Sequence, residues 1–108
     1  MKTQQLTLTT TILCTVALTI RRFVSLAGAP TAAAAWSPGV AAVNCDPGQQ
    51  ATVNVQGIML VEAGAAIAAG VQVEADAQAR AVTLAAGVSL GRALDAAGAA
   101  GEVIRILR

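Results

Sequence analysis

Glycine and proline interrupt the apolar segments of this chain so often that no regular element can run for long. Its 108 residues include 10 glycines and 3 prolines. Residues 52–56 (TVNVQ) alternate polar and apolar side chains, which is the period-two pattern of a half-buried strand. Alanine-rich segments at 63–69, 75–81 and 93–100 favour helix, but no apolar period of 3.6 lasts beyond two turns in any of them. The pattern therefore predicts a mainly β fold with only short helical turns.

Short strands separated by turn residues recur along the chain. The expected strands are residues 22–26, 39–44, 52–56, 58–61, 71–74, 80–84, 88–94 and 103–107. The polar link at 75–79 predicts that its flanking segments form a hairpin. Such a series is typical of a small single-domain β-barrel or β-sandwich. We divide the chain into an N-terminal arm or first strand, residues 1–20, and a compact β domain, residues 21–108.

The amino-terminal segment has the pattern of a strand rather than of an export signal. Residues 6–9 (LTLT) alternate, and the run from residue 6 to residue 20 contains six threonines. A twin-arginine export signal places its arginines before the apolar run, whereas Arg21 and Arg22 follow it. The run is also too short and too polar to span a bilayer. We therefore expect an extended, strand-forming arm that no local turn ties to a partner; an exported precursor cleaved near residue 30 is the alternative.

The core of such a domain is expected to be poor in large side chains. Apolar residues make up 56% of the chain, but 26 of them are alanines, and the aromatic residues are Phe23 and Trp36 alone. Alanine buries little apolar area, so a lone copy would be marginally stable. We therefore expect a homo-oligomer, a trimer in preference to a dimer.

Residue types that carry catalysis or bind metals are scarce. The chain has no histidine, and Cys14 and Cys45 fit no zinc-ligand spacing, so we interpret both as small buried hydrophobes and leave a disulfide between them open. Glu74 and Asp76 stand two residues apart, as paired catalytic carboxylates sometimes do. We instead expect Asp76 to open the hairpin link and Glu74 to be solvated beside it. We predict no enzymatic activity, no cofactor and no metal.

Charge is low and balanced along the chain. Seven Lys+Arg against six Asp+Glu leave a net charge of +1. Proteins that bind nucleic acid present a clustered basic surface, which this composition does not supply. We therefore expect neither nucleic acid nor membrane as a partner.

Several glycine-containing motifs occur together in an order that is similar to one protein family. They are residues 22–24 (RFV), 39–40 (GV), 53–58 (VNVQGI), 61–67 (VEAGAAI) with Gly70, 76–82, 91–94 (GRAL) and 101–104 (GEVI). With these motifs, residues 12–108 resemble the small capsid cement, or head decoration, proteins of tailed bacteriophages. One position departs from that family, which commonly has glycine where this chain has Ala79. Residues 61–70 also look like the repeating turn of biotinyl and lipoyl carrier domains, but the hairpin lacks the lysine that those domains modify.

The resemblance implies a non-enzymatic virion protein that binds the outer surface of an assembled shell and stabilises it against the pressure of packaged DNA. Its partners would be the major capsid protein and further copies of itself, met in the host cytoplasm during assembly. The alternative function is an exported bacterial β-domain that acts as a surface or periplasmic binding module.

Two regions are candidates for contact with the capsid or with another copy. They are Leu6, Thr7, Leu8 and Thr9 of the arm, and Trp36 beside a Pro-Gly loop. A strand edge can extend a partner's sheet, and a lone tryptophan often anchors an interface. For Trp36, a role as the single large plug of an alanine-rich core is equally consistent with the sequence.

Overall fold

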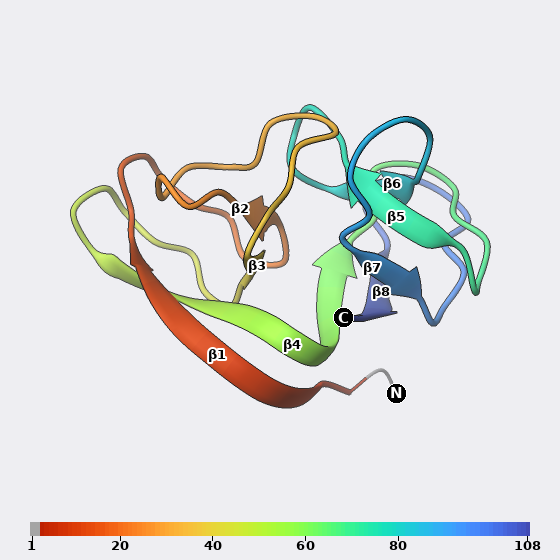
Figure 1. Ribbon diagram of the computed structural model, residues 1–108, viewed down its shortest axis with the longest axis horizontal. Coiled ribbons are helices and arrows are strands. Elements are labelled where there is room, and N and C mark those ends of the chain that lie inside the picture. The colour runs from red at the N-terminus through yellow and green to blue at the C-terminus, as the bar shows by residue number, and fades with distance from the viewer. Residues whose placement is uncertain (1–2) are drawn as a thin grey trace.

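A computed structural model describes residues 3–108 and shows an eight-stranded sheet over that range (Figure 1). The strands are β1 (Gln5–Leu13), β2 (Phe23–Val24), β3 (Gly39–Ala41), β4 (Gln50–Glu62), β5 (Gln72–Ala75), β6 (Ala81–Thr83), β7 (Gly91–Ala93) and β8 (Val103–Leu107). Their order is β2-β3-β4-β8-β7-β5-β6, with β1 paired to β4 outside this path, and every ladder is antiparallel. The prediction of a mainly β fold is confirmed.

The sheet is not closed into a barrel, so that alternative is wrong. β2 and β6 lie at the two ends of the strand order and share no ladder within the described residues. Four strands are only two or three residues long, so each offers few backbone groups for pairing with a further strand. The expected helical turns are also absent from residues 3–108. Glycines divide the alanine-rich segments, which form turns and isolated bridges such as Ile67 with Ala97.

The longest strand, β4, organises the sheet. Asn54 in β4 lies opposite Thr9 of β1 and also opposite Val40 of β3. Beyond the residues of β4 that pair with β3, β4 pairs with β8, from Ile58 onward. β1 therefore lies along one edge of β4, whereas β3 and β8 share the other edge (Figure 1).

Gly57 joins residues 52–56 and 58–61, which the sequence presents as separate strands. Its φ is 113°, a value that glycine adopts freely, and a Cβ at this position would collide with the carbonyl oxygen of Gln5 in β1. The β1–β4 register shifts on both sides of Leu8, next to this glycine. Such a bulge bends a strand, and β4 curves between its β1-paired and β8-paired halves (Figure 1).

Two clusters of buried side chains stabilise the sheet. The larger core comprises Phe23, Val40, Met59, Val61, Ala63, Ile67, Val73, Ala75, Ala79, Ala81, Leu90, Ala93, Ala97, Ile104 and Ile106. The smaller core comprises Cys14, Leu18, Val24, Ala41, Cys45, Ala51 and Val53. The larger core thus draws on β2 to β8, whereas the smaller core joins the segment after β1 to β2, β3 and the first half of β4.

The amino-terminal strand is not a free arm. β1 pairs with β4 from Gln5 opposite Ile58 to Leu13 opposite Gln50. A strand at this position is therefore confirmed, but the expectation that it lacks a partner within the chain is wrong. Its partner is distant in sequence, so no local turn reveals the pairing. The division of the chain at residue 20 stays a prediction.

The β5–β6 hairpin follows the sequence prediction. Asp76 Oδ1 accepts hydrogen bonds from the backbone N–H groups of Gln78 and Arg80 at 2.9 and 2.8 Å, so Asp76 opens the link as expected. Ala79 has a φ of 61° and is fully buried. The turn thus keeps the left-handed conformation that glycine favours, although the residue here carries a Cβ.

Glu74 is buried, so the expectation that it is solvated is wrong. Its side chain is 7% exposed, and Oε1 accepts a hydrogen bond from the N–H of Ala85 at 3.0 Å. The chain after β6 folds back over β5, where Leu84 N–H donates to the carbonyl of Gln72 at 2.9 Å. The segment after β6 therefore covers the Glu74 carboxylate, which the sequence alone places on a solvent-exposed hairpin.

Candidate interaction surface

β1 presents an exposed and uncharged strand edge. Every residue from Gln5 to Leu13 except Ile12 is exposed, and none of them is charged or proline. One edge of β1 pairs with β4, and the opposite edge pairs with no strand among residues 3–108. Native edge strands are usually protected by charge, proline, short length or a bulge, because their free N–H and C=O groups template pairing with another chain. Apart from the bulge near Leu8, β1 has none of these protections.

Contacts at both ends hold β1 against the sheet. At its start, Gln4 Oε1 accepts hydrogen bonds from Asn54 Nδ2 at 3.3 Å and from the N–H of Leu60 at 3.1 Å. Just after its end, the N–H of Cys14 donates to the carbonyl of Gln49 at 2.8 Å. The predicted contact residues of β1 therefore lie on a paired strand rather than on a loose tail.

Trp36 lies on the surface, so its interpretation as a core plug is wrong. Its side chain is 52% exposed, and Phe23 is instead the aromatic residue of the larger core. The neighbouring Ser37 is fully buried and anchors the loop: its Oγ donates to the carbonyl of Val24 at 2.7 Å and accepts from the N–H of Gly39 at 3.1 Å. Trp36 is thus exposed on a loop that is fixed at the next residue.

Sequence reasoning missed several other exposed apolar side chains. They are Leu13, Val16, Leu26, Val43, Val88 and Leu107. Leu26 is 70% exposed, and its loop is bonded to the segment after β1, since Thr15 N–H donates to the carbonyl of Gly28 at 3.0 Å. The available signal was a large apolar residue just before the turn residues Gly28 and Pro30.

The structure keeps the two predicted contact regions apart. β1 lies along one edge of β4, whereas the connection that carries Trp36 leads into β3 on the other edge (Figure 1). Leu6, Thr7, Leu8 and Thr9 share one strand. They and Trp36 are therefore two separate candidate surfaces.

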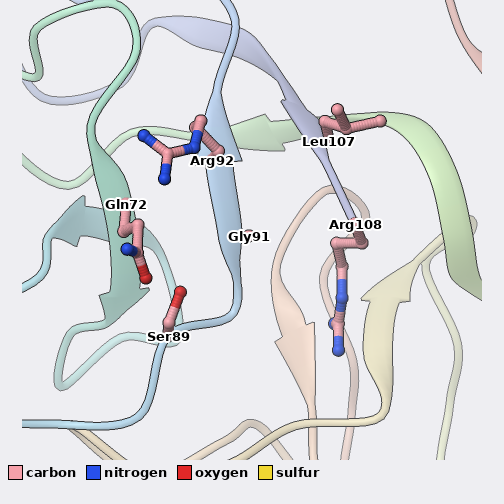
Figure 2. A pocket seen from close by; sticks show the side chains of 6 residues that line it. All are labelled: Gln72, Ser89, Gly91, Arg92, Leu107 and Arg108. Atoms are coloured by element: carbon pink, nitrogen blue, oxygen red, sulfur yellow. The ribbon is translucent and has the colours of Figure 1, made fainter.

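A shallow hollow on the β5–β8 side of the molecule offers no catalytic arrangement. The hollow has a volume of about 400 Å³. Figure 2 shows the residues that line it: Gln72, Ser89, Gly91, Arg92, Leu107 and Arg108. Arg92 Nη1 donates to the carbonyl of Gly70 at 2.6 Å, and Arg108 Nη2 donates to that of Ser37 at 3.0 Å. Burial lowers the pKa of Arg108. No base accompanies Ser89 among the described residues that line the hollow, so it lacks a nucleophile–base pair.

Charged side chains pair in a network that joins three parts of the sheet. Glu62 Oε2 lies 3.3 Å from Arg22 Nη2 and 3.7 Å from Arg80 Nη1, and Arg80 Nε lies 3.2 Å from Asp76 Oδ2. These contacts link the start of β2, the end of β4 and the β5–β6 hairpin. The network therefore gives these carboxylates a structural role.

Neither a metal centre nor a membrane-crossing helix is found in the part of the chain that the structure describes. Residues 3–108 contain no group of three or more His, Cys, Asp or Glu side chains placed to hold a metal ion. Within the same range, no helix has the length and apolar character needed to cross a membrane.

One known family matches the chain over its full length. The family model is that of a phage cement protein, and it matches residues 1–108. No curated protein and no solved structure matches the chain. The matching family is one of structural phage proteins, which is not an enzyme class and implies association with a phage capsid. The resemblance carried by the glycine motifs is thus confirmed, and the chain belongs to the phage cement protein family.

Proposed function

We propose that this chain binds the outer surface of a phage head through the major capsid protein and stabilises the shell against the outward pressure of packaged DNA. Family membership supports the association with a capsid. The exposed edge of β1 is the observation that carries the mode of attachment. On this proposal the protein acts without a cofactor, first in the host cytoplasm during assembly and then on the virion.

Attachment would extend the sheet at β1. The open edge offers backbone N–H and C=O groups along a nine-residue strand, and a strand of the capsid protein can pair with them. Leu6, Leu8 and Leu13 are exposed on this strand, so a partner that covers them gains apolar burial. Since β1 carries no charge, pairing would require no ionised side chain of β1 to lose its water.

We also propose that copies associate with one another on the shell, as trimers in preference to dimers. The smaller core has only seven buried residues, and exposed apolar side chains lie beside it. Contact with a further copy would therefore bury additional apolar area in the part of the monomer that buries the least. Closed cyclic symmetry lets each copy use the same patch, and several simultaneous contacts slow dissociation. Trp36 is the proposed contact on the side of β4 opposite β1.

The variants Leu8→Lys and Trp36→Ala test the two surfaces separately. Leu8 is half exposed, so a lysine fits there with the β1–β4 pairing intact, while its charge opposes addition of another strand. We expect Leu8→Lys to weaken the coating of undecorated capsids at least tenfold, or about 1.4 kcal/mol. A substitution is more informative than deletion of residues 2–9, because the deletion would also remove a partner of β4.

Val88→Lys is the matched control for Leu8→Lys, since Val88 is an exposed apolar residue outside β1. It should coat capsids at the same concentration as the unchanged chain. Thermal unfolding of every variant, measured without capsids, checks that each remains folded. Unchanged coating by both Leu8→Lys and Trp36→Ala would show that neither surface is used.

A further inference from the structure

Two buried thiols take no part in the proposed function. Cys14 and Cys45 are both free and belong to the smaller core. Cys14 directly follows β1, and Cys45 lies in the connection between β3 and β4. The two cysteines therefore come from segments that only the fold brings together.

Backbone hydrogen bonds align these two segments. The N–H of Cys14 donates to the carbonyl of Gln49 at 2.8 Å, and the N–H of Gly48 donates to the carbonyl of Cys14 at 2.8 Å. Leu18 and Cys45 exchange a second pair of bonds at 2.8 and 3.1 Å. The segments thus run antiparallel, with one cysteine on each.

Both thiols are buried in this seven-residue core. Cys45 Sγ lies 3.9 Å from Gln49 Oε1, so it points toward the residue whose carbonyl accepts the Cys14 N–H. Burial, together with a side-chain hydrogen bond to Cys45, raises the pKa of Cys14 to about 11. A turn closed by the Gln49 N–H, which donates to the carbonyl of Asp46 at 3.2 Å, brings Cys45 back toward the residues that bond Cys14. The two sulfur atoms therefore belong to one small core, as a disulfide requires.

We propose that Cys14 and Cys45 are a redox site that forms an intramolecular disulfide when the protein meets a disulfide oxidant such as oxidised glutathione. One cysteine thiolate attacks a sulfur of the oxidant and breaks its S–S bond; a mixed disulfide forms and one glutathione thiolate leaves. The second cysteine thiolate attacks the protein sulfur of that mixed disulfide, which forms the Cys14–Cys45 bond and releases the second glutathione. The two cysteine thiols are oxidised, and one glutathione disulfide is reduced to two glutathione thiols, which take up the two protons that the cysteines lose.

The bond would tie the end of β1 to the segment that leads into β4. It would enclose residues 14–45 in a covalent loop and so stabilise the smaller core. A reducing cytoplasm keeps such thiols free, and an oxidising medium outside the cell allows the bond to form. The prediction of when the disulfide forms, after the protein leaves the cytoplasm, therefore rests on the proposed function. The prediction that the disulfide can form does not.

The test uses the purified full chain without capsids, incubated under native conditions with oxidised glutathione or with dithiothreitol. We expect the oxidised chain to lose about 2 Da, the mass of two hydrogen atoms. Its non-reduced tryptic digest should contain one cross-linked pair of peptides, since Arg21 and Arg22 separate the two cysteines. Its midpoint of thermal unfolding should lie roughly 10–20 °C above that of the reduced chain.

Cys14→Ser and Cys45→Ser serve as controls, and each should abolish the mass loss and the shift of the midpoint. The main comparison is made on the unchanged chain, so it does not depend on how well these variants fold. Mixed disulfides that persist on both cysteines, dimers linked between chains, or thiols that stay free after the treatment would overturn the proposal. Since no capsid is present, failure here is distinct from failure of Leu8→Lys to alter coating.

Discussion

The two halves of β4 lie in very different surroundings. The second half pairs with β8 and contributes Met59 and Val61 to a core of 15 buried residues. The first half contributes Ala51 and Val53 to a core of seven, and it is flanked by β1, whose outer edge pairs with no strand among residues 3–108. One strand thus begins in a region with few buried residues beside an exposed strand and ends in the larger core.

The two cores also differ in the size of their apolar side chains. Large side chains gather in the larger core, where Phe23, Met59, Leu90, Ile104 and Ile106 are all fully buried. Six alanines fill the space between them. The expected shortage of bulky residues therefore falls on the smaller core, where Leu18 is the largest apolar side chain.

Val61→Ala and Val53→Ala compare the two cores directly, and the first should show the largest effect. Both valines lie on β4 and both are 0% exposed. We expect Val61→Ala to lower the free energy of unfolding by roughly 2–3 kcal/mol, through lost apolar burial and a cavity that the dense core cannot close. Val53→Ala should cost only about 1–2 kcal/mol, because the thin core can collapse around the gap. Equal losses in denaturant titrations would show that the two cores are packed alike.

Gly57→Ala should break the junction between the two regions. Gly57 and Gly48 both have positive φ, but only at Gly57 does a Cβ collide with a neighbouring backbone atom, the carbonyl oxygen of Gln5. Gly48→Ala is thus the matched control, with conformational strain of about 1 kcal/mol. Gly57→Ala should cost roughly 2 kcal/mol or more.

Hydrogen exchange adds a local readout to the same pair of variants. The amides of β1 should exchange faster in Gly57→Ala than in Gly48→Ala, because the clash separates β1 from β4. Similar exchange at β1 in both variants would mean that the close approach at Gly57 is not needed for the pairing.

Alkaline pH should produce the smallest effect, confined to the smaller core. The pKa of Cys14 is raised from 9.0 to about 11 by burial first, then by the contact with Cys45 and the charge of Asp46. Below pH 9 the thiol is protonated in both states; between pH 9 and 11 the unfolded chain binds fewer protons than the folded one. Stability should therefore fall as pH rises through this window.

The measurement is the midpoint of thermal unfolding of the reduced chain between pH 8 and pH 11. The chain has no tyrosine and a single lysine, so few other side chains titrate in this range. Cys14→Ser should show a smaller fall than the unchanged chain. The same slope in both would assign the effect to another group.

Much of the local structure follows from neighbouring residues. The alternation in residues 103–107 places Ile104 and Ile106 on one face, and both are fully buried. Asp76 opens the predicted hairpin link, since its side chain reaches backbone groups only two and four residues ahead. Interactions of such short range are encoded in the order of the residues themselves.

The candidate surfaces were predicted only in part. Leu6, Thr7, Leu8 and Thr9 form an exposed strand as their alternation suggests, yet the pairing of that strand with β4 was missed. By sequence, Trp36 is equally consistent with a core position and with an interface, and only the folded structure, in which its side chain is 52% exposed, places it on the surface. Burial of a single side chain depends on which distant segment covers it, and a local pattern does not contain that information.

Residue patterns were enough to predict the mainly β fold, because turn residues and short alternating segments act over a few positions. The order of the glycine motifs was enough to indicate the phage cement family. Only the folded chain shows that Gly57 joins two segments into one long strand, that Glu74 is buried, and that Cys14 and Cys45 share one core. Each of these outcomes requires contact between segments far apart in the chain. Their cause lies in loop closure and shared packing, which are properties of the folded molecule rather than of any single window of sequence.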